Sequence, residues 1–378
     1  MNAASKPYFI NLDALRFFAA TGFFMHAFTI RIEGVQYPAW MNQVSRFASS
    51  GALCVNVLHV LSGFLITYLL LAEEKSTGQF SILRYYLRRT LRIWPLYFTM
   101  VITFLFIVPM VMQAFGFTYH ETANPWSYFF FWNNFAMLSD GFPYSPVLAV
   151  LWTVSVEEQF YVVMPWLMKF FRKQRVAVFL AIAIVSTLAR IYFRNEGTTL
   201  FFHTLCIMSD FAVGAFIAWL AVNNHSWFHR WKKMPRAVNF GIYLALLVMI
   251  VFYHPVFDSP LATIAERLIL GLAFGHVILD QAFGENKAFN MHRIPGFVWL
   301  GKRAFGIYCF HQVGILASVH LFKAMNWLQS PWQFLLLLPL LSFFITVLIA
   351  AFSYRFFEQP FLDLKKKFEM NGAAGRTV

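Results

Sequence analysis

Long apolar runs recur along the whole of this 378-residue chain. A helix needs about 20 consecutive apolar residues to cross the roughly 30 Å hydrocarbon core of a lipid bilayer. Inside that core the backbone must satisfy its own hydrogen bonds, as a helix does. The pattern therefore predicts an all-α, polytopic integral membrane protein with about ten transmembrane helices. The expected spans are residues 11–30, 52–72, 93–112, 148–168, 176–193, 204–222, 237–254, 262–281, 297–321 and 333–356.

Charged residues make up only 12% of the chain, about half the fraction found in a soluble domain. The three cysteines, Cys54, Cys206 and Cys309, all fall in expected spans. They offer neither a disulfide framework nor the paired spacing of a metal site, so we expect no metal. No internal repeat or low-complexity tract divides the sequence. We therefore expect one membrane domain over residues 1–378, ending in a short basic cytoplasmic tail at about residues 358–378.

The distribution of Lys and Arg predicts the orientation of the chain, because these residues accumulate in short cytoplasmic loops. With both termini in the cytoplasm, 24 of the 30 basic residues lie on the inner side and 6 on the outer side. The same bias accounts for the net charge of +13 without a nucleic-acid partner, since anionic lipid headgroups attract basic residues. The six outer residues would be Arg31, Arg46, Arg190, Arg194, Arg267 and Lys323.

Two adjacent carboxylates, Glu157 and Glu158, interrupt an apolar stretch that is otherwise typical of a membrane span. A charge at that depth costs several kcal/mol, so it indicates a functional site unless a buried partner neutralises it. A structural ion pair with Arg190 or Arg267 is the simpler alternative.

Six short stretches follow one another in the chain: Asp13–Arg16 followed by His26, Val55–Ile66, Arg88–Tyr97, Trp152–Pro165, Phe305–His311 and Ser353–Pro360. In this order they resemble the acyltransferase 3 family of integral-membrane O-acyltransferases. Each stretch alone is weak evidence, but together they cover nearly the whole chain and are specific.

The resemblance implies a single membrane acyltransferase domain of the stand-alone type, without a fused extracytoplasmic domain. Such an enzyme would move an acyl group, usually acetyl from cytosolic acetyl-CoA, to a hydroxyl of a cell-surface glycan or a related carbohydrate. The implied location is the bacterial inner (plasma) membrane. The implied partners are membrane lipids and a carbohydrate or lipid-linked glycan acceptor, and a homo-oligomer is compatible with them.

Helix geometry, at about 1.5 Å of rise per residue, sorts the candidate residues into two layers. The expected inner layer contains Arg16, Arg88, Arg89, Arg92 and Glu358. The expected outer layer contains His26, His59, Ser62, Glu158, Asp210 and His311.

The two layers suit acyl transfer from a phosphorylated carrier. Guanidinium groups form bidentate, charge-assisted hydrogen bonds with phosphates, so the four arginines are the expected CoA-binding residues. A sugar hydroxyl needs a base, and His26 is the candidate, either as a base or as a transient acyl carrier. Glu158, or Glu157, would orient or compensate the imidazolium, with Tyr161 on the same helix face. Ser62, His59, Asp210, His311 and Glu358 are candidates for substrate binding or support.

Simpler interpretations exist for these residues. The Arg88–Arg92 run is also what a positive-inside membrane anchor looks like. A histidine inside a membrane helix is often a hydrogen-bonded packing residue, and Ser62 with Gly63 can permit close helix packing.

Two departures from the family pattern concern the base. The family separates the first-helix Arg and His by eleven positions, whereas Arg16 and His26 are ten apart. One residue fewer turns the histidine by about 100° around the helix unless a local bulge compensates. His59 stands where the family usually has an aromatic residue. Either the catalytic imidazole has moved, or the chain is a divergent member.

A proton-coupled transporter or flippase of a glycan, lipid or small anion is the alternative from another functional class. Buried carboxylates, histidines and inner cations fit such a carrier on physical grounds. An inverted repeat or paired Gly/Pro-broken helices would favour it, and the sequence shows neither. A sensor or scaffold that has lost catalysis is a third interpretation.

The charge bias generates a topological prediction. Reporters fused after Val378 and within residues 223–236 should both report cytoplasm, and a reporter within residues 113–147 should report the outside. Opposite locations for the two chain termini would contradict it.

Overall fold

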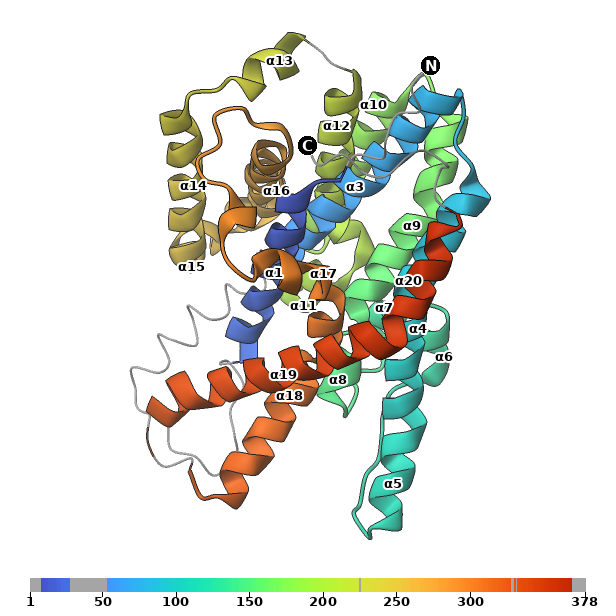
Figure 1. Cartoon of the computed structure of the whole chain (residues 1–378), viewed down its shortest axis with the longest axis vertical. Coiled ribbons are helices and arrows are strands. Elements are labelled where there is room, and N and C mark those ends of the chain that lie inside the picture. Colours follow the sequence, from blue (N-terminus) through green and yellow to red (C-terminus); the bar gives the residue numbers. More distant parts are fainter. Residues whose placement is uncertain (1–7, 28–52, 224–225, 328–329, 331, 369–378) are drawn as a thin grey trace.

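The computed structural model describes residues 8–27, 53–223, 226–327, 330 and 332–368. Every element in these ranges is helical, which confirms the all-α prediction (Figure 1). The first half contains α1 (Ile10–Ala27), α3 (Cys54–Thr77), α4 (Ile82–Ile102), η2 (Thr103–Ile107), α5 (Val108–Ala114), α6 (Pro125–Phe129), α7 (Asn133–Ser139), α8 (Pro146–Ala149), α9 (Trp152–Phe170), α10 (Arg175–Tyr192), α11 (Gly197–Phe202) and α12 (Thr204–Asn223). The second half contains α13 (Ser226–Lys232), α14 (Arg236–Val251), α15 (Tyr253–Phe257), α16 (Pro260–Phe283), η3 (Met291–Arg293), α17 (Phe297–Lys302), α18 (Ala304–Ala324), η4 (Gln333–Leu337), α19 (Leu338–Ser353), η5 (Tyr354–Glu358) and α20 (Gln359–Lys366).

The described residues form eight helical segments long and apolar enough to cross a membrane, or nine if the bent pair α13 and α14 is one span. The chain is therefore a polytopic membrane protein. The count of ten helices and the cytoplasmic position of both termini stay predictions.

The third long helix begins earlier than expected, at Ile82 and not at residue 93. Ser81 caps it, because its side chain accepts a hydrogen bond from the backbone N–H of Arg84. Arg88, Arg89 and Arg92 consequently lie on a continuous helix that also contains the membrane-embedded residues up to Ala114.

The centre of the fold is a close contact between α3 and α12, which also contact α16. A methyl group built on Gly63 would lie 2.3 Å from the carbonyl oxygen of Phe211, and one on Gly214 would lie 2.1 Å from the carbonyl oxygen of Val60. Each glycine thus admits the backbone of the other helix, as small residues do in bilayers. This confirms the packing interpretation for Gly63.

The C-terminal helices α19, η5 and α20 form one continuous helical rod, drawn in red in Figure 1. The rod packs first on α18 and ends against α4. Its middle section, η5, is a π-helical turn that ends at Glu358. Such turns insert one extra residue and are frequent at functional sites. Here the turn determines the direction in which the side chain of Glu358 extends from the rod.

The segment between α5 and α9 is organised around one carboxylate. Glu121 accepts hydrogen bonds from the backbone N–H groups of Thr122, Ala123, Tyr144 and Ser145 at 2.9–3.1 Å. Tyr119 donates its hydroxyl to the same carboxylate, and burial together with the charge of Glu121 raises the pKa of Tyr119 to about 12. The expected outer loop is therefore a folded cap with three short helices.

The close contact of α3 and α12 predicts the effect of one methyl group. Gly63→Ala should destabilise the protein by about 1–3 kcal/mol, because overpacking forces two backbones apart. Gly241→Ala is the matched control, since a methyl group there meets no atom within 4 Å. Thermal unfolding of the purified protein in detergent measures both, and equal melting temperatures would refute the packing account.

Candidate functional site

A cavity of about 520 Å³ lies between α1, α3, α4, the α17–α18 junction and the C-terminal rod. It brings together all five residues of the expected inner layer. Its lining includes Asp13, Arg16, Leu65, Ile66, Leu69, Glu73, Tyr85, Arg88, Arg89, Arg92, Lys302, Glu358, Lys365 and Lys366.

The cavity carries an excess of positive charge, with seven basic side chains against three acidic ones. Arg16 pairs with Asp13, and Arg88 pairs with Glu73 at 2.8 Å. Within the described part of the chain, neither Arg89 nor Arg92 forms an ion pair with a carboxylate. Guanidinium groups that remain unpaired in a cavity are suited to bind an anion.

Helical spacing explains why these residues meet. Tyr85, Arg88, Arg89 and Arg92 follow the pattern i, i+3, i+4 and i+7, so they share one face of α4. The hydroxyl of Tyr85 donates to the carbonyl oxygen of Tyr161 at 3.2 Å, which ties this face to α9.

The cavity has an apolar wall on α3, formed by Leu65, Ile66 and Leu69. Ser62 precedes these residues by three, four and seven positions and so belongs to the same face of the helix. The face that lines the cavity therefore continues to Ser62.

Ser62 lies in a hydrogen-bonded group with Glu157 and Tyr161, which we call the Ser–Glu–Tyr cluster. The Oγ of Ser62 donates to Oε1 of Glu157 at 3.0 Å, and the hydroxyl of Tyr161 lies 2.7 Å from Oε2 of Glu157 and 3.1 Å from the Oγ of Ser62. The guanidinium of Arg89, a cavity residue, lies over the ring of Tyr161 at 5.0 Å. The cluster thus borders the cationic cavity.

The neighbouring residues of α9 point elsewhere. Oε2 of Glu158 accepts a hydrogen bond from the indole of Trp94 at 3.2 Å, and its Oε1 has no hydrogen-bond partner among the described residues. The amide of Gln159 donates to the carbonyl oxygen of Phe131 and to Asn134, which attaches the cap between α5 and α9 to α9. Glu157 and Glu158 therefore belong to different surroundings.

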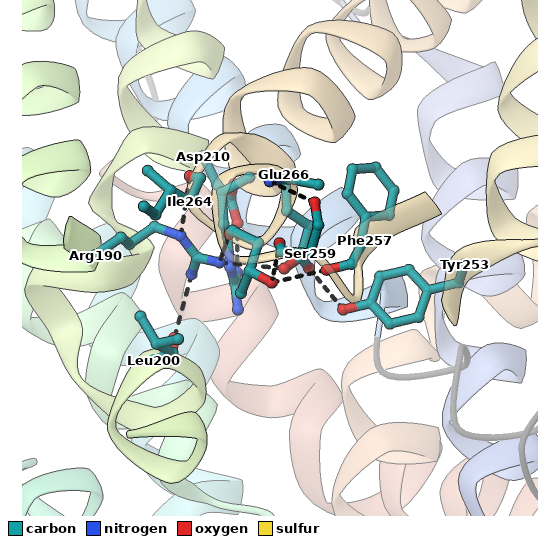
Figure 2. Close-up of polar contacts among 11 residues, drawn as sticks. Arg190, Leu200, Asp210, Tyr253, Phe257, Ser259, Ile264 and Glu266 are labelled. Carbon is teal, nitrogen blue, oxygen red and sulfur yellow. Dashed lines mark hydrogen bonds and ion pairs between the residues drawn. The ribbon is translucent and has the colours of Figure 1, made fainter. Parts of the chain in front are cut away.

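A second group of buried charges joins α10, α12 and α16. Figure 2 shows Arg190 reaching toward Glu266, with which it pairs at 3.1 Å, and Tyr253 donating to the same carboxylate. Arg267 pairs with Asp210 at 2.7 Å. Each cation here has its own carboxylate, so the alternative pairing of Glu157 or Glu158 with these arginines is wrong.

His59 lies beside this second group, fully buried, with its Nδ1 3.8 Å from Asp210 and its ring stacked on Phe211. Neither ring nitrogen has a hydrogen-bond partner within the described ranges. The Nδ1 of His311 lies 2.5 Å from the carbonyl oxygen of Tyr308 on its own helix. These histidines are thus outside the Ser–Glu–Tyr cluster.

His26 is in α1, but its side chain lies outside the described residues. The backbone of α1 is regular α-helix from Ile10 to Ala27, so no bulge corrects the shortened spacing from Arg16.

Several charged or polar residues that line the cavity were not among the site residues expected from the sequence, although Asp13 stood in one of the six stretches: Asp13, Glu73, Tyr85, Lys302, Lys365 and Lys366. Glu73 and Asp13 pair with its arginines, and Lys302 borders it from the α17–α18 junction. The first two could have been found as acidic residues on apolar helices, because such residues need a cationic partner.

Comparison with known proteins decides the family. The model of a family described as an acyltransferase domain matches residues 9–354. The chain belongs to this acyltransferase family. The match confirms the resemblance drawn from the six short stretches.

Relatives in this acyltransferase family include the peptidoglycan O-acetyltransferase OatA of Listeria monocytogenes, 25% identical over 338 residues, which cover 83% of this chain and 52% of the relative. The putative peptidoglycan O-acetyltransferase YrhL of Bacillus subtilis is 22% identical, over 83% of this chain and 51% of the relative. A putative O-acetyltransferase of Staphylococcus aureus is 24% identical, over 84% of this chain and 53% of the relative. The chain spans about half the length of these relatives. No solved structure matches it significantly.

The buried charge pairs of this acyltransferase-family chain predict a contrast between two neighbours. Asp210→Asn should destabilise the protein by about 3–5 kcal/mol, because it leaves the buried cation of Arg267 without a counter-charge. His59→Phe should be tolerated, since it removes nitrogens that have no described hydrogen-bond partner and keeps the stack on Phe211. Thermal unfolding in detergent checks both, and an Asp210 variant as stable as the wild type would contradict the pairing.

Proposed function

We propose that this protein is a membrane O-acetyltransferase that moves an acetyl group from cytosolic acetyl-CoA to a hydroxyl of a cell-surface glycan. The observation that carries the proposal is the cationic cavity bordered by the Ser–Glu–Tyr cluster. Family membership supports the reaction class, and the names of the relatives support a carbohydrate acceptor. We place it in the bacterial inner membrane, with the cavity toward the cytoplasm.

The cavity suits the donor. CoA carries several phosphate charges, and the excess of cations matches them. Arg89 and Arg92 are free of carboxylate partners within the described ranges, and Lys365 and Lys366 add charge from α20. The apolar wall at Leu65 and Leu69 suits the uncharged arm that ends in the thioester. In this arrangement, the thioester approaches Ser62.

The chemistry needs a base, because a sugar hydroxyl is a poor nucleophile at neutral pH. His26 remains the predicted base, and Glu158 or Glu157 the group that compensates its charge. Glu157 is itself suited to accept a proton, since its carboxylate lies at hydrogen-bond distance from two hydroxyl groups. In the transfer from CoA, a hydroxyl oxygen attacks the thioester carbonyl carbon and the base takes the hydroxyl proton. The C–S bond then breaks, and the CoA thiolate takes that proton and leaves as the thiol.

Mass spectrometry of surface glycans tests this function. Glycans from cells with the gene should carry an acetyl group that is absent after deletion. The gene should restore it, and a gene encoding His26→Ala should not, although the variant protein accumulates normally. Identical glycans in both strains, together with a defect in uptake or export, would replace the proposal with the transporter.

The unpaired arginines predict a donor-specific defect. Arg92→Ala should raise the KM for acetyl-CoA by about tenfold to 100-fold, as expected from the loss of about 1.5–3 kcal/mol of charged hydrogen bonding. Lys should restore the activity only in part, because it lacks the bidentate fork. Arg88→Ala should act in the same direction, but it also frees Glu73.

Assays in membrane vesicles measure this effect, with Arg194→Ala as the control. Arg194 is exposed and donates to the carbonyl oxygen of Ile191, and it is not among the residues that line the cavity. A wild-type KM for acetyl-CoA in the Arg92 variant would return that residue to the class of membrane anchors.

A further inference from the structure

The hydrogen bond of Ser62, which is partly buried, differs from those of three buried hydroxyl groups on membrane helices of this protein. The hydroxyl groups of Ser318, Ser342 and Thr346 donate to carbonyl oxygens one turn back on their own helices. Such bonds satisfy a hydroxyl group in apolar surroundings. Ser62 instead donates to a carboxylate on another helix, Glu157 of α9, at 3.0 Å.

We propose that Ser62 is an acyl carrier: it takes the acyl group from the thioester as an ester and passes it to the acceptor hydroxyl. This inference rests on the proposed function and adds to it a covalent intermediate. Glu157 is the base that activates Ser62.

The geometry meets the requirement for an activated nucleophile. A serine hydroxyl is weak by itself and needs a base within about 2.6–3.2 Å, which Glu157 provides. A phenol has one proton, and the shorter contact of Tyr161 is to Oε2 of Glu157. Ser62 therefore directs its own proton to Oε1, and the two hydroxyl groups occupy both oxygens of the carboxylate.

The position of Ser62 suits a carrier. It shares a helix face with the cavity wall at Leu65, Ile66 and Leu69, and Tyr161 links it to Arg89 of the cavity. Ser62 lies eight residues from the start of α3 at Cys54, or about 12 Å along the helix. CoA can then stay on the cationic side while only the acyl group moves beyond the cavity.

In the first step, the acyl group moves from CoA to Ser62. The proton of Ser62 moves to Glu157 as Oγ attacks the carbonyl carbon of the thioester. The C–S bond then breaks, and the CoA thiolate takes the proton from Glu157 and leaves as the thiol. The hydroxyl of Tyr161 donates to Oε2 of Glu157 and so holds the carboxylate beside Oγ during this step.

The second step reverses these roles. The acceptor hydroxyl gives its proton to Glu157, and its oxygen attacks the ester carbonyl on Ser62. The bond between the carbonyl carbon and Oγ breaks, and Oγ takes the proton from Glu157. The serine and the carboxylate return to their starting forms, and no redox partner is needed.

A trapping experiment tests the carrier. The full chain in lipid nanodiscs is mixed with acetyl-CoA labelled in its acetyl group, without acceptor, then quenched, digested and mapped by mass spectrometry. The acetyl label should be found on Ser62. The label should disappear in Ser62→Ala. It should persist in the matched control Ser318→Ala, which removes a buried hydroxyl group from a different helix.

A second variant keeps the test independent of folding. Ser62→Cys preserves a nucleophile but forms a thioester, so its label should be released by neutral hydroxylamine, unlike the ester on the wild type. Transfer to glycan in membrane vesicles should fall by about 100-fold or more in Ser62→Ala and in Glu157→Gln, because each removes a reacting group.

The outcomes separate the carrier from the proposed function. Wild-type transfer from acetyl-CoA to glycan with an equally active Ser62→Ala, or with the label on another residue, overturns the carrier and leaves the function intact. Wild-type protein that neither becomes labelled nor acetylates glycan overturns the proposed function itself.

Discussion

Charge inside a hydrocarbon layer must be neutralised locally or used, and this constraint organises the whole protein. Where α10, α12 and α16 meet, the neutralisation is complete: Arg190 has Glu266, and Arg267 has Asp210. At the cavity it is incomplete, because seven cations face three carboxylates. The first group can hold helices together without any ligand. The second has an excess of positive charge that an anionic ligand would neutralise, which is why we assign binding to the cavity and support to the paired charges.

Consecutive residues of α9 serve three separate contacts because a helix turns by about 100° per residue. Glu157 faces α3 and its serine, Glu158 faces the indole of Trp94 on α4, and Gln159 faces the cap between α5 and α9. A pair of adjacent carboxylates therefore need not act as a pair. Here the hydrogen-bonded partners of each one, and not their proximity in sequence, distinguish the candidate base from its neighbour.

The sequence alone predicted the membrane fold and the gathering of Arg16, Arg88, Arg89, Arg92 and Glu358, because helical spacing and apolar length are local properties. It could not predict which charges pair. Asp210 and Arg267 are 57 residues apart, and their contact depends on α12 packing beside α16. The helix boundaries also differed from the expected ones where local hydrogen bonds or helix geometry set them. Examples are the Ser81 cap at the start of α4 and the π-helical turn before α20. The catalytic role of His26 stays a prediction, because its side chain lies outside the described residues.

The π-helical turn at Tyr354–Glu358 has a consequence for how this chain can vary. Such a turn holds one more residue than an α-helical turn of the same rise. Deleting one residue there would let the turn revert to α-helix while α20 keeps its orientation, so Lys365 and Lys366 would stay at the cavity. Deleting one residue within the regular helix α19 would instead rotate every later residue by about 100° and carry both lysines away from the cavity. The π-helical turn is therefore the part of the rod where the chain can lose a residue with the least effect on α20.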